Sequence, residues 1–209
     1  MQPRRIMALV LALAGLTLTA AACSASVSTG SSTTPASSAT GGSSGKTYAN
    51  TQYHFSITPD PVFTQGKPTD TTSSGSSSVF NIAFADASGT KVAGSYVDGV
   101  QVSVYKLTRA LKPSEIPKLK KEFTGVVDQL MSGLTSGKIA QPLRLAQING
   151  VPGFRLAYTY TQGTTDIAAI TYFLIKGQYE YQVTGQASQQ TWTKLSPKLE
   201  STVKSFTVQ

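Results

Sequence analysis

The sequence predicts an α+β fold: an antiparallel sheet of about six to seven strands, with a long helix after the third strand and a second helix at the C-terminus. Apolar and polar residues alternate in several segments, which is the period of a half-buried strand. Between residues 116 and 134, apolar side chains recur every three or four positions, which is the period of a helix face. Asn149-Gly150 is a strong hairpin signal, and sequential hairpins indicate an antiparallel sheet.

Three strands are expected before the long helix. Apolar residues alternate with polar ones over 53–57, and Pro59-Asp60-Pro61 ends that strand. The polar segment 64–78 predicts a loop, whereas 87–94 predicts a turn. The strands are therefore placed at residues 53–57, 79–85 and 100–107.

The long helix is expected to begin at Ser114, because serine is a favoured N-cap residue. Pro117 would then lie in the first turn, where its missing N–H costs little. Gly133 and Gly137 mark the end of the helix. Its apolar face comprises Ile116, Leu119, Phe123, Val127, Leu130 and Leu134.

Four strands are expected after this helix, at residues 142–148, 153–161, 167–176 and 178–185. The turns between them are predicted at Asn149-Gly150, Gln162-Gly163 and Gly177. A closing helix opens at Ser188, and Pro197 is expected to break or kink it. The apolar residues of this last segment are Trp192, Leu195, Leu199, Val203 and Phe206.

The N-terminus has the organisation of a secretory signal peptide. Arg4 and Arg5 form a positive head, residues 6–18 form an uncharged apolar run, and residues 19–22 are small. An uncleaved transmembrane helix is the alternative. A span needs about 20 apolar residues, however, and no basic stop-transfer cluster follows this run.

Cys23 is the only cysteine, and it follows the small residues Ala20, Ala21 and Ala22. This segment resembles the lipobox of bacterial lipoproteins. The resemblance implies that the signal is cut just before Cys23, that the sulfur carries a diacylglycerol, and that the protein is extracytoplasmic. It would be anchored to the cell membrane, or to the periplasmic face of an outer membrane in a host that has one. Cleavage by the ordinary signal peptidase, or a lone thiol that pairs with another chain, are the alternatives.

Residues 24–45 consist of Ser, Thr, Gly, Ala and Pro apart from Val27, which predicts a flexible linker. Gly41-Gly42-Ser43-Ser44-Gly45 matches the nucleophile-elbow pattern of hydrolases, but that motif needs a strand before it and a helix after it. The chain is therefore divided into a cleaved signal at 1–22, a lipidated cysteine with its linker at 23–45, and one globular domain at 46–209.

The domain resembles the PsbP-like fold superfamily, to which small lipoproteins of the LpqN type are thought to belong. The resemblance rests on the order of elements, on the opening YANTQYHFSITPDPVF at 48–63 and on the closing VKSFTV at 203–208. It implies an interaction or assembly module of the cell envelope, not a catalyst.

The domain offers few groups for catalysis. His54 is the only histidine, it is expected within a strand, and a Ser-His-Asp triad would depend on it. No zinc-ligand set, calcium loop or phosphate-binding motif is present in the sequence, so we expect no metal and no cofactor. The acidic residues are scattered along the chain without a spacing that indicates a catalytic pair.

The chain is basic, with 18 Lys and Arg against 10 Asp and Glu. Removal of residues 1–22 takes away two arginines and leaves 16 against 10, a formal charge of +6. In an exported protein, the expected acidic partners are anionic lipids or wall polymers, not nucleic acid. Six cations cluster around the start of the helix, opposed only by Glu115: Lys106, Arg109, Lys112, Lys118, Lys120 and Lys121.

Of this cluster, Lys118, Lys120 and Lys121 oppose the helix dipole. They are the candidate patch for an anionic surface, and a plain solvated face is the alternative. An aromatic-rich sheet face is predicted from Tyr158, Tyr160, Tyr172, Tyr179 and Tyr181, as core or as the lining of a groove.

These observations favour a membrane-anchored, non-enzymatic accessory module that contacts another envelope protein, anionic lipid or wall polymer. A carrier of a small apolar ligand or lipid is the alternative. An envelope hydrolase is the third hypothesis, and it would need converging carboxylates or a serine site.

Overall fold

The computed structural model describes residues 45–70 and 78–209. The predicted signal peptide, Ala20 to Cys23 and nearly all of the linker lie outside these residues. None of the helices described is both long and apolar enough to cross a membrane. The elements are, in chain order, β1 (Tyr48–Asn50), β2 (Phe55–Ile57), β3 (Phe63–Gln65), β4 (Thr69–Asp70), β5 (Ser78–Asp86), β6 (Lys91–Val92), β7 (Ser95–Tyr96), β8 (Gly99–Leu111), the 3-10 helix η1 (Pro113–Leu119), α1 (Lys120–Gly133), β9 (Lys138–Ile148), β10 (Val151–Gln162), β11 (Thr165–Ser188), α2 (Gln189–Lys204) and β12 (Thr207–Val208).

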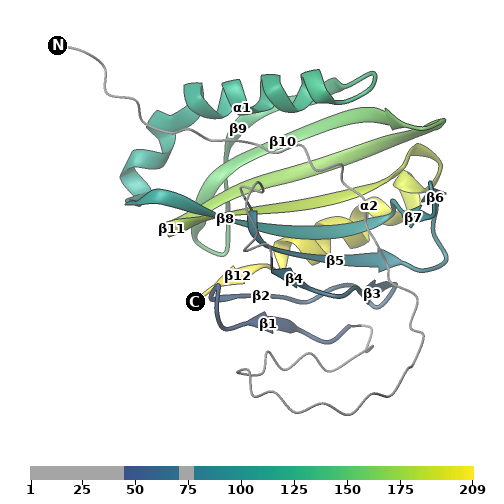
Figure 1. Cartoon of the computed structure of the whole chain (residues 1–209), viewed down its shortest axis with the longest axis horizontal. Helices are drawn as coiled ribbons and strands as arrows, with labels where there is room; N and C mark the ends of the chain where they lie inside the picture. The colour runs from purple at the N-terminus through teal and green to yellow at the C-terminus, as the bar shows by residue number, and fades with distance from the viewer. Residues whose placement is uncertain (1–44, 71–77) are drawn as a thin grey trace.

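An antiparallel sheet forms the middle layer of the molecule, in the order β3-β5-β8-β11-β10-β9, with β4 beside β5 (Figure 1). β11 occupies two adjacent places in this sheet. Its first part, 165–174, pairs with β10, and its second part, 177–186, pairs with β8. The Oγ1 atoms of Thr171 and Thr184 are 2.8 Å apart, so the two parts lie side by side.

The reversal within β11 occurs at Gly177. A straight strand of its 24 residues would be about 80 Å long. Gly177 has a φ of 61°, which glycine adopts without steric cost. The turn predicted at Gly177, and the α+β fold with its antiparallel sheet and two helices, are therefore confirmed.

A second, small sheet joins the two ends of the domain in the order β1-β2-β12. The hydroxyls of Ser56 on β2 and Thr207 on β12 are 2.7 Å apart. The backbone N–H of Gln209 also donates to the carbonyl of His54 at 2.8 Å. The strand predicted over 53–57 is only half right, because His54 lies in the turn before β2 with a φ of 54°.

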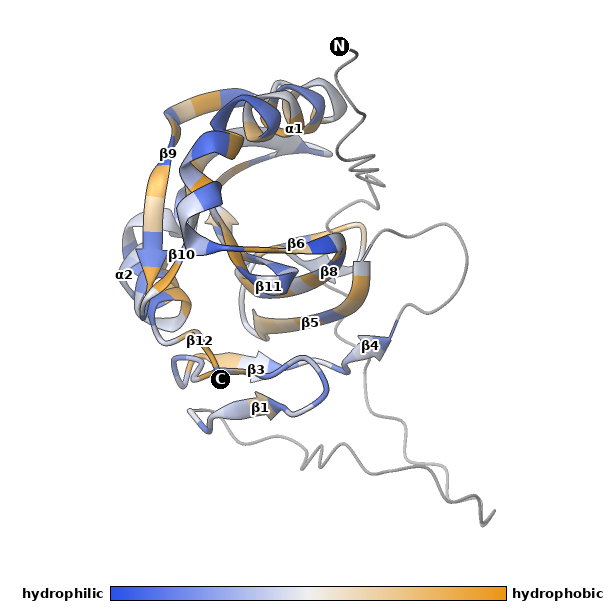
Figure 2. Cartoon of the chain, turned by 90° about the vertical axis from the view of Figure 1, so that its left-hand side faces the viewer, coloured by the Kyte–Doolittle hydropathy of each residue, from blue (hydrophilic) through white to orange (hydrophobic). Residues whose placement is uncertain are grey.

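Two apolar cores lie on opposite faces of the large sheet. Figure 2 shows the α1 layer above the sheet and the β1 and β3 region below it. Under α1, the ring of Phe123 lies 4.8 Å from that of Phe154 and 5.6 Å from that of Phe173. On the other face, α2 and the small sheet bury Phe55, Tyr181, Leu195, Leu199 and Phe206.

The start of the long helix differs from the prediction. Residues 113–119 form the 3-10 helix η1, and α1 begins only at Lys120. The prediction of Ser114 as N-cap is wrong, because the carboxylate of Glu115 accepts the backbone N–H of Lys112 at 2.8 Å. Two prolines within seven residues remove two backbone donors, which favours a short irregular turn before the regular helix.

The closing helix begins as predicted, since Ser188 accepts the backbone N–H of Thr191 at 3.3 Å. The break expected at Pro197 is wrong, because α2 continues through it to Lys204. Burial of Leu195 and Leu199, on either side of the proline, holds both halves of the helix on the sheet. The strands β1, β3, β4, β6, β7 and β12 were not predicted, and each has only two or three residues.

Candidate binding groove

A groove of about 510 Å³ lies between α2 and the strands β9, β10 and β11. Its wall on α2 is formed by residues spaced three, four and four positions apart, which places them on one face of the helix. These residues are Gln189, Trp192, Ser196 and Glu200. Trp192 is the only tryptophan in the chain and is partly exposed.

The groove exists because the sheet below it carries small side chains. Ala157 on β10 and Ala168 on β11 line it, with Ala140 on β9. Thr159, opposite Ala168 in the register, adds a hydroxyl. Elsewhere on the same face of β11, Tyr172 and Leu174 pack against the α2 core. Methyl groups therefore leave open a volume that larger side chains fill nearby.

Arg155 on β10 lies at one end of this groove and is only 7 % exposed. Its Nη1 donates to Oε1 of Gln141 on β9, and its guanidinium lies 5.9 Å from the centre of the Tyr172 ring. Among the described residues, no carboxylate forms an ion pair with it. Arg155 was not predicted as a site residue, although it is the only charged residue in β10 and could have been found by that signal.

The α2 wall is held in place by a buried carboxylate at the N-terminus of the helix. Asp98 is fully buried, and its Oδ1 accepts the backbone N–H of Ser188 at 2.7 Å. Its Oδ2 accepts the backbone N–H of Thr90 at 2.9 Å. A carboxylate at a helix N-terminus satisfies free donors and complements the dipole. Asp98 thus fixes the end of α2 from which Gln189 and Trp192 project.

The opposite face of the sheet carries a second polar cluster, which the sequence analysis also missed. Glu180 on β11 is fully buried, and its Oε1 accepts from Nε2 of Gln182 at 2.9 Å. Its Oε2 has no hydrogen-bond partner among the described residues. Burial raises the pKa of the Glu180 carboxyl to about 7. Tyr105 lies opposite in the register, and burial together with Glu180 raises its pKa to about 12.

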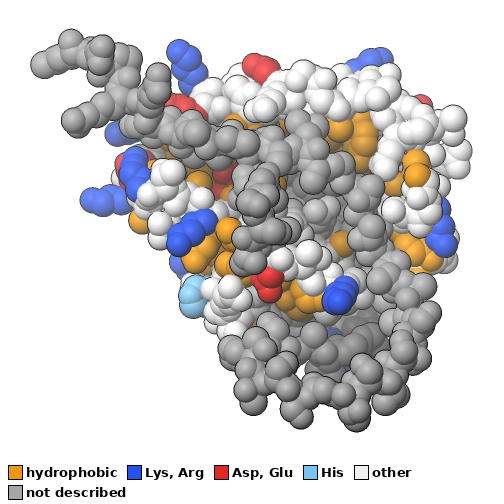
Figure 3. Space-filling view, viewed as in Figure 1, with side chains coloured by type: hydrophobic (Ala, Val, Ile, Leu, Met, Phe, Trp, Pro, Cys, Tyr) orange, Lys and Arg blue, Asp and Glu red, His pale blue; other side chains and the backbone are white. Residues whose placement is uncertain are grey.

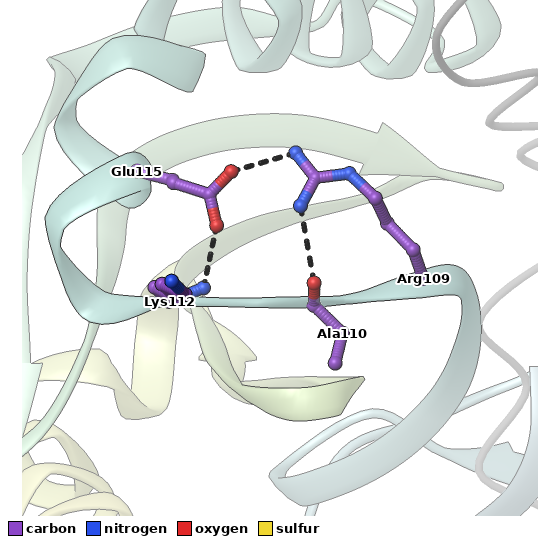
Figure 4. A network of polar contacts seen from close by, with 4 residues as sticks. All are labelled: Arg109, Ala110, Lys112 and Glu115. Carbon is purple, nitrogen blue, oxygen red and sulfur yellow. Dashed lines mark hydrogen bonds and ion pairs between the residues drawn. The ribbon is translucent and has the colours of Figure 1, made fainter.

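The predicted basic patch surrounds η1 and the start of α1. Lys118, Lys120 and Lys121 are all exposed, and Lys and Arg side chains gather at this end of the molecule in Figure 3. Glu115 is paired with Arg109 at 2.8 Å and also accepts from the backbone of Lys112 (Figure 4). Its hydrogen bond from Arg109 lowers the pKa of Glu115 to about 2. Among the described residues, no carboxylate pairs with the three lysines, so their role at an anionic surface stays a prediction.

Changing Lys118, Lys120 and Lys121 together to glutamine is expected to weaken binding to vesicles of phosphatidylglycerol by about a hundredfold. Each lysine near such a surface contributes about 1 kcal/mol. Cosedimentation at low and high salt measures the effect. Lys67, Lys138 and Lys194, also exposed, provide a matched triple variant with the same change in charge, and it is expected to bind like the unsubstituted chain. Equal binding of both variants would contradict the patch.

The structure does not bring the remaining residues singled out from the sequence, the five tyrosines and His54, together in one site. The five tyrosines do not share one face: Tyr158 and Tyr160 belong to the core under α1, whereas Tyr172, Tyr179 and Tyr181 belong to the core on the other face. His54 is exposed in its turn. Across residues 45–70 and 78–209, no group of three or more His, Cys, Asp or Glu could hold a metal ion.

Comparison with known proteins gives structural neighbours only. No protein-family model matches the chain. No curated protein sequence matches it either. The solution structure of cyanobacterial PsbP (CyanoP) from Synechocystis sp. PCC 6803 is similar over 83 % of this chain and 98 % of that one, with a TM-score of 0.53 and 11 % identity.

Two further structures cover similar shares of the chain. A protein from Bacteroides thetaiotaomicron VPI-5482 matches over 79 % of this chain and 49 % of its own, with a TM-score of 0.50 and 10 % identity. LpqN of Mycobacterium tuberculosis, a protein involved in cell envelope biogenesis, matches over 78 % of this chain and 84 % of its own, with a TM-score of 0.48 and 12 % identity. At such identities the likeness concerns the fold alone. On the likeness to CyanoP, the chain has the PsbP-like fold that its sequence predicted.

Proposed function

We propose that this chain is an exported, lipid-anchored accessory protein of the cell envelope, whose domain binds a small molecule and catalyses no reaction. The observation that carries the proposal is the groove beside α2. Its volume of about 510 Å³ lies within the range of small-molecule sites, which are commonly 300–1,000 Å³. Like such sites, it combines apolar side chains with a few placed polar groups, here Arg155, Gln189 and Ser196.

The proposed anchor is Cys23, on the strength of the lipobox resemblance at Ala20 to Cys23. A diacylated or triacylated cysteine binds membranes stably without a spanning helix. The 22 linker residues that follow would let the domain stand off the membrane by roughly 25 Å on average. The groove would then face the aqueous space beside the membrane and exchange its ligand there.

Changing Cys23 to serine is expected to release the protein from the membrane fraction, because serine cannot accept the diacylglycerol. The unsubstituted protein is expected to begin at a lipid-modified Cys23, which its intact mass measures. Native mass spectrometry of the exported, released variant is expected to show a small molecule retained by part of the population.

The lipid anchor and the binding function are tested by separate outcomes. An unsubstituted protein whose N-terminus is not a lipid-modified Cys23 would contradict the anchor. A released protein whose native mass never exceeds that of the polypeptide, even after incubation with an envelope lipid extract, would contradict the binding function.

A further inference from the structure

We infer that the groove takes an organic anion: a small molecule whose carboxylate or phosphate pairs with Arg155 and whose apolar body lies over the alanine floor against Trp192. This inference rests on the proposed binding function and adds the chemistry of the ligand. It comes from the charges around the groove, the shape of its floor and the position of the single tryptophan.

Arg155 is a buried cation that lines the groove. A guanidinium has five N–H donors, and Gln141 accepts from one of its nitrogens. A side chain only 7 % exposed that keeps its charge is normally paired with a carboxylate, since an unpaired buried charge is costly. None of the described carboxylates forms an ion pair with Arg155. Arg155 lines a groove that is large enough for an anion to complete the pairing.

A second arginine is the neighbour of Arg155 across the sheet. Arg144 on β9 lies directly opposite it in the register, so both arginines project from the same face. Like charges placed directly opposite destabilise a strand pair. Arg144 is exposed and is likewise without a carboxylate partner in the part of the chain described. An anion at this end of the groove would relieve the repulsion between the two.

The carboxylate that lines the groove does not cancel this charge. Glu200 lies on α2, and its Oε2 is paired with Nζ of Lys204 at 3.2 Å. Its charge is therefore balanced within the helix. The Arg155 end of the groove remains positive.

The floor and wall define the rest of the ligand. Ala157 and Ala168 present methyl groups, and Trp192 presents part of an aromatic ring. These surfaces suit an aliphatic or flat aromatic body. The planar guanidinium fork suits a carboxylate or a phosphate oxyanion in two-point contact.

The test uses the full chain carrying Cys23→Ser, with Trp192 as the optical probe. Because it is the only tryptophan, its emission reports on the groove without interference. Decanoate and decyl phosphate, titrated below their micelle concentrations, are expected to shift the emission saturably. Neutral decyl maltoside, with the same chain, is expected to bind at least tenfold more weakly. The probe with the higher affinity, decanoate or decyl phosphate, shows whether the ligand carries a carboxylate or a phosphate.

Changing Arg155 to methionine is expected to weaken the binding of decanoate and of decyl phosphate at least tenfold. The weak binding of decyl maltoside is expected to stay unchanged. Arg155→Lys keeps the charge without the fork and is expected to restore part of the affinity. Ala168→Leu fills the floor with the charges intact and is expected to abolish binding. Arg109→Gln removes one cation that does not line the groove, and this matched control is expected to bind like the parent. Circular dichroism establishes that each variant is folded.

Equal binding of the neutral and anionic probes, with no effect of Arg155→Met, would overturn the anion inference while leaving a binding function in place. Absence of any saturable shift with both anions would also overturn it. If Arg155→Met fails to fold, the comparison of Arg155→Lys with Ala168→Leu and with the neutral probe decides the same question.

Discussion

The free energy of unfolding is expected to fall by about 3 kcal/mol between about pH 4.5 and pH 8, and replacing Glu180 by glutamine is expected to abolish this fall. Glu180 is fully buried, and burial raises its pKa from 4.5 in the unfolded chain to about 7 in the folded one. Between these values the folded protein keeps a proton that the unfolded chain releases. Stability therefore falls as the pH rises through this window and levels off above pH 7.

Urea unfolding at several pH values measures this effect as the difference between the two proteins. The glutamine keeps the acceptor for Nε2 of Gln182 and carries no charge, so its curve is expected to be flatter by that amount. Glu122→Gln, on the exposed face of α1, is the matched control and is expected to follow the unsubstituted protein. If the Glu180 variant declines in parallel with the unsubstituted protein, the carboxyl is not protonated in the folded state.

Changing Gly153 to alanine is expected to destabilise the domain by about 4 kcal/mol or more, enough to unfold much of it. Gly153 on β10 lies opposite Leu174 on β11. A Cβ there would be 1.9 Å from the carbonyl oxygen of Phe173 and 2.9 Å from the Cα of Leu174. Both contacts are with backbone, so β10 and β11 would have to separate at this point.

Gly125→Ala is expected to have the opposite effect on the stability of the domain. Gly125 is exposed in α1, and a Cβ built on it meets nothing within 4 Å. Alanine is favoured over glycine inside a helix by about 1 kcal/mol, so this variant is expected to be slightly more stable. Thermal unfolding followed by circular dichroism compares the two. A Gly153→Ala protein that melts within a few degrees of the unsubstituted one would mean that β10 and β11 are farther apart than described.

The fold could be predicted because its largest elements have strong periodic patterns. The alternation around Tyr179 and Tyr181, and the turn glycines Gly150 and Gly177, placed the meander correctly. Short strands such as β1 and β12 could not be found this way, since two or three residues carry no period. The start of the helix was misplaced because Ser114 has the right propensity, whereas Glu115 has the contact with Lys112.

The groove could not be predicted from local pattern. Its alanines lie on three strands, and only the register of those strands with α2 brings Ala140, Ala157 and Ala168 together. Arg155 alternates with its neighbours as an outward-facing polar residue would, and the sequence gives no sign that it is buried beside Gln141 and Tyr172. Glu180 was misleading in the same way, because a polar residue between Tyr179 and Tyr181 predicts exposure to solvent, not full burial.

The pairing of β12 with β2 has a consequence for how the chain folds. Ser56 and Thr207 bond across a separation of 151 residues, so the small sheet closes only when nearly the whole domain is in place. Closing such a long loop costs entropy before any contact repays it, and folds of this kind are slow. The large sheet and its helices would therefore collapse first. Pairing of β12 with β2 would then join the two ends of the domain.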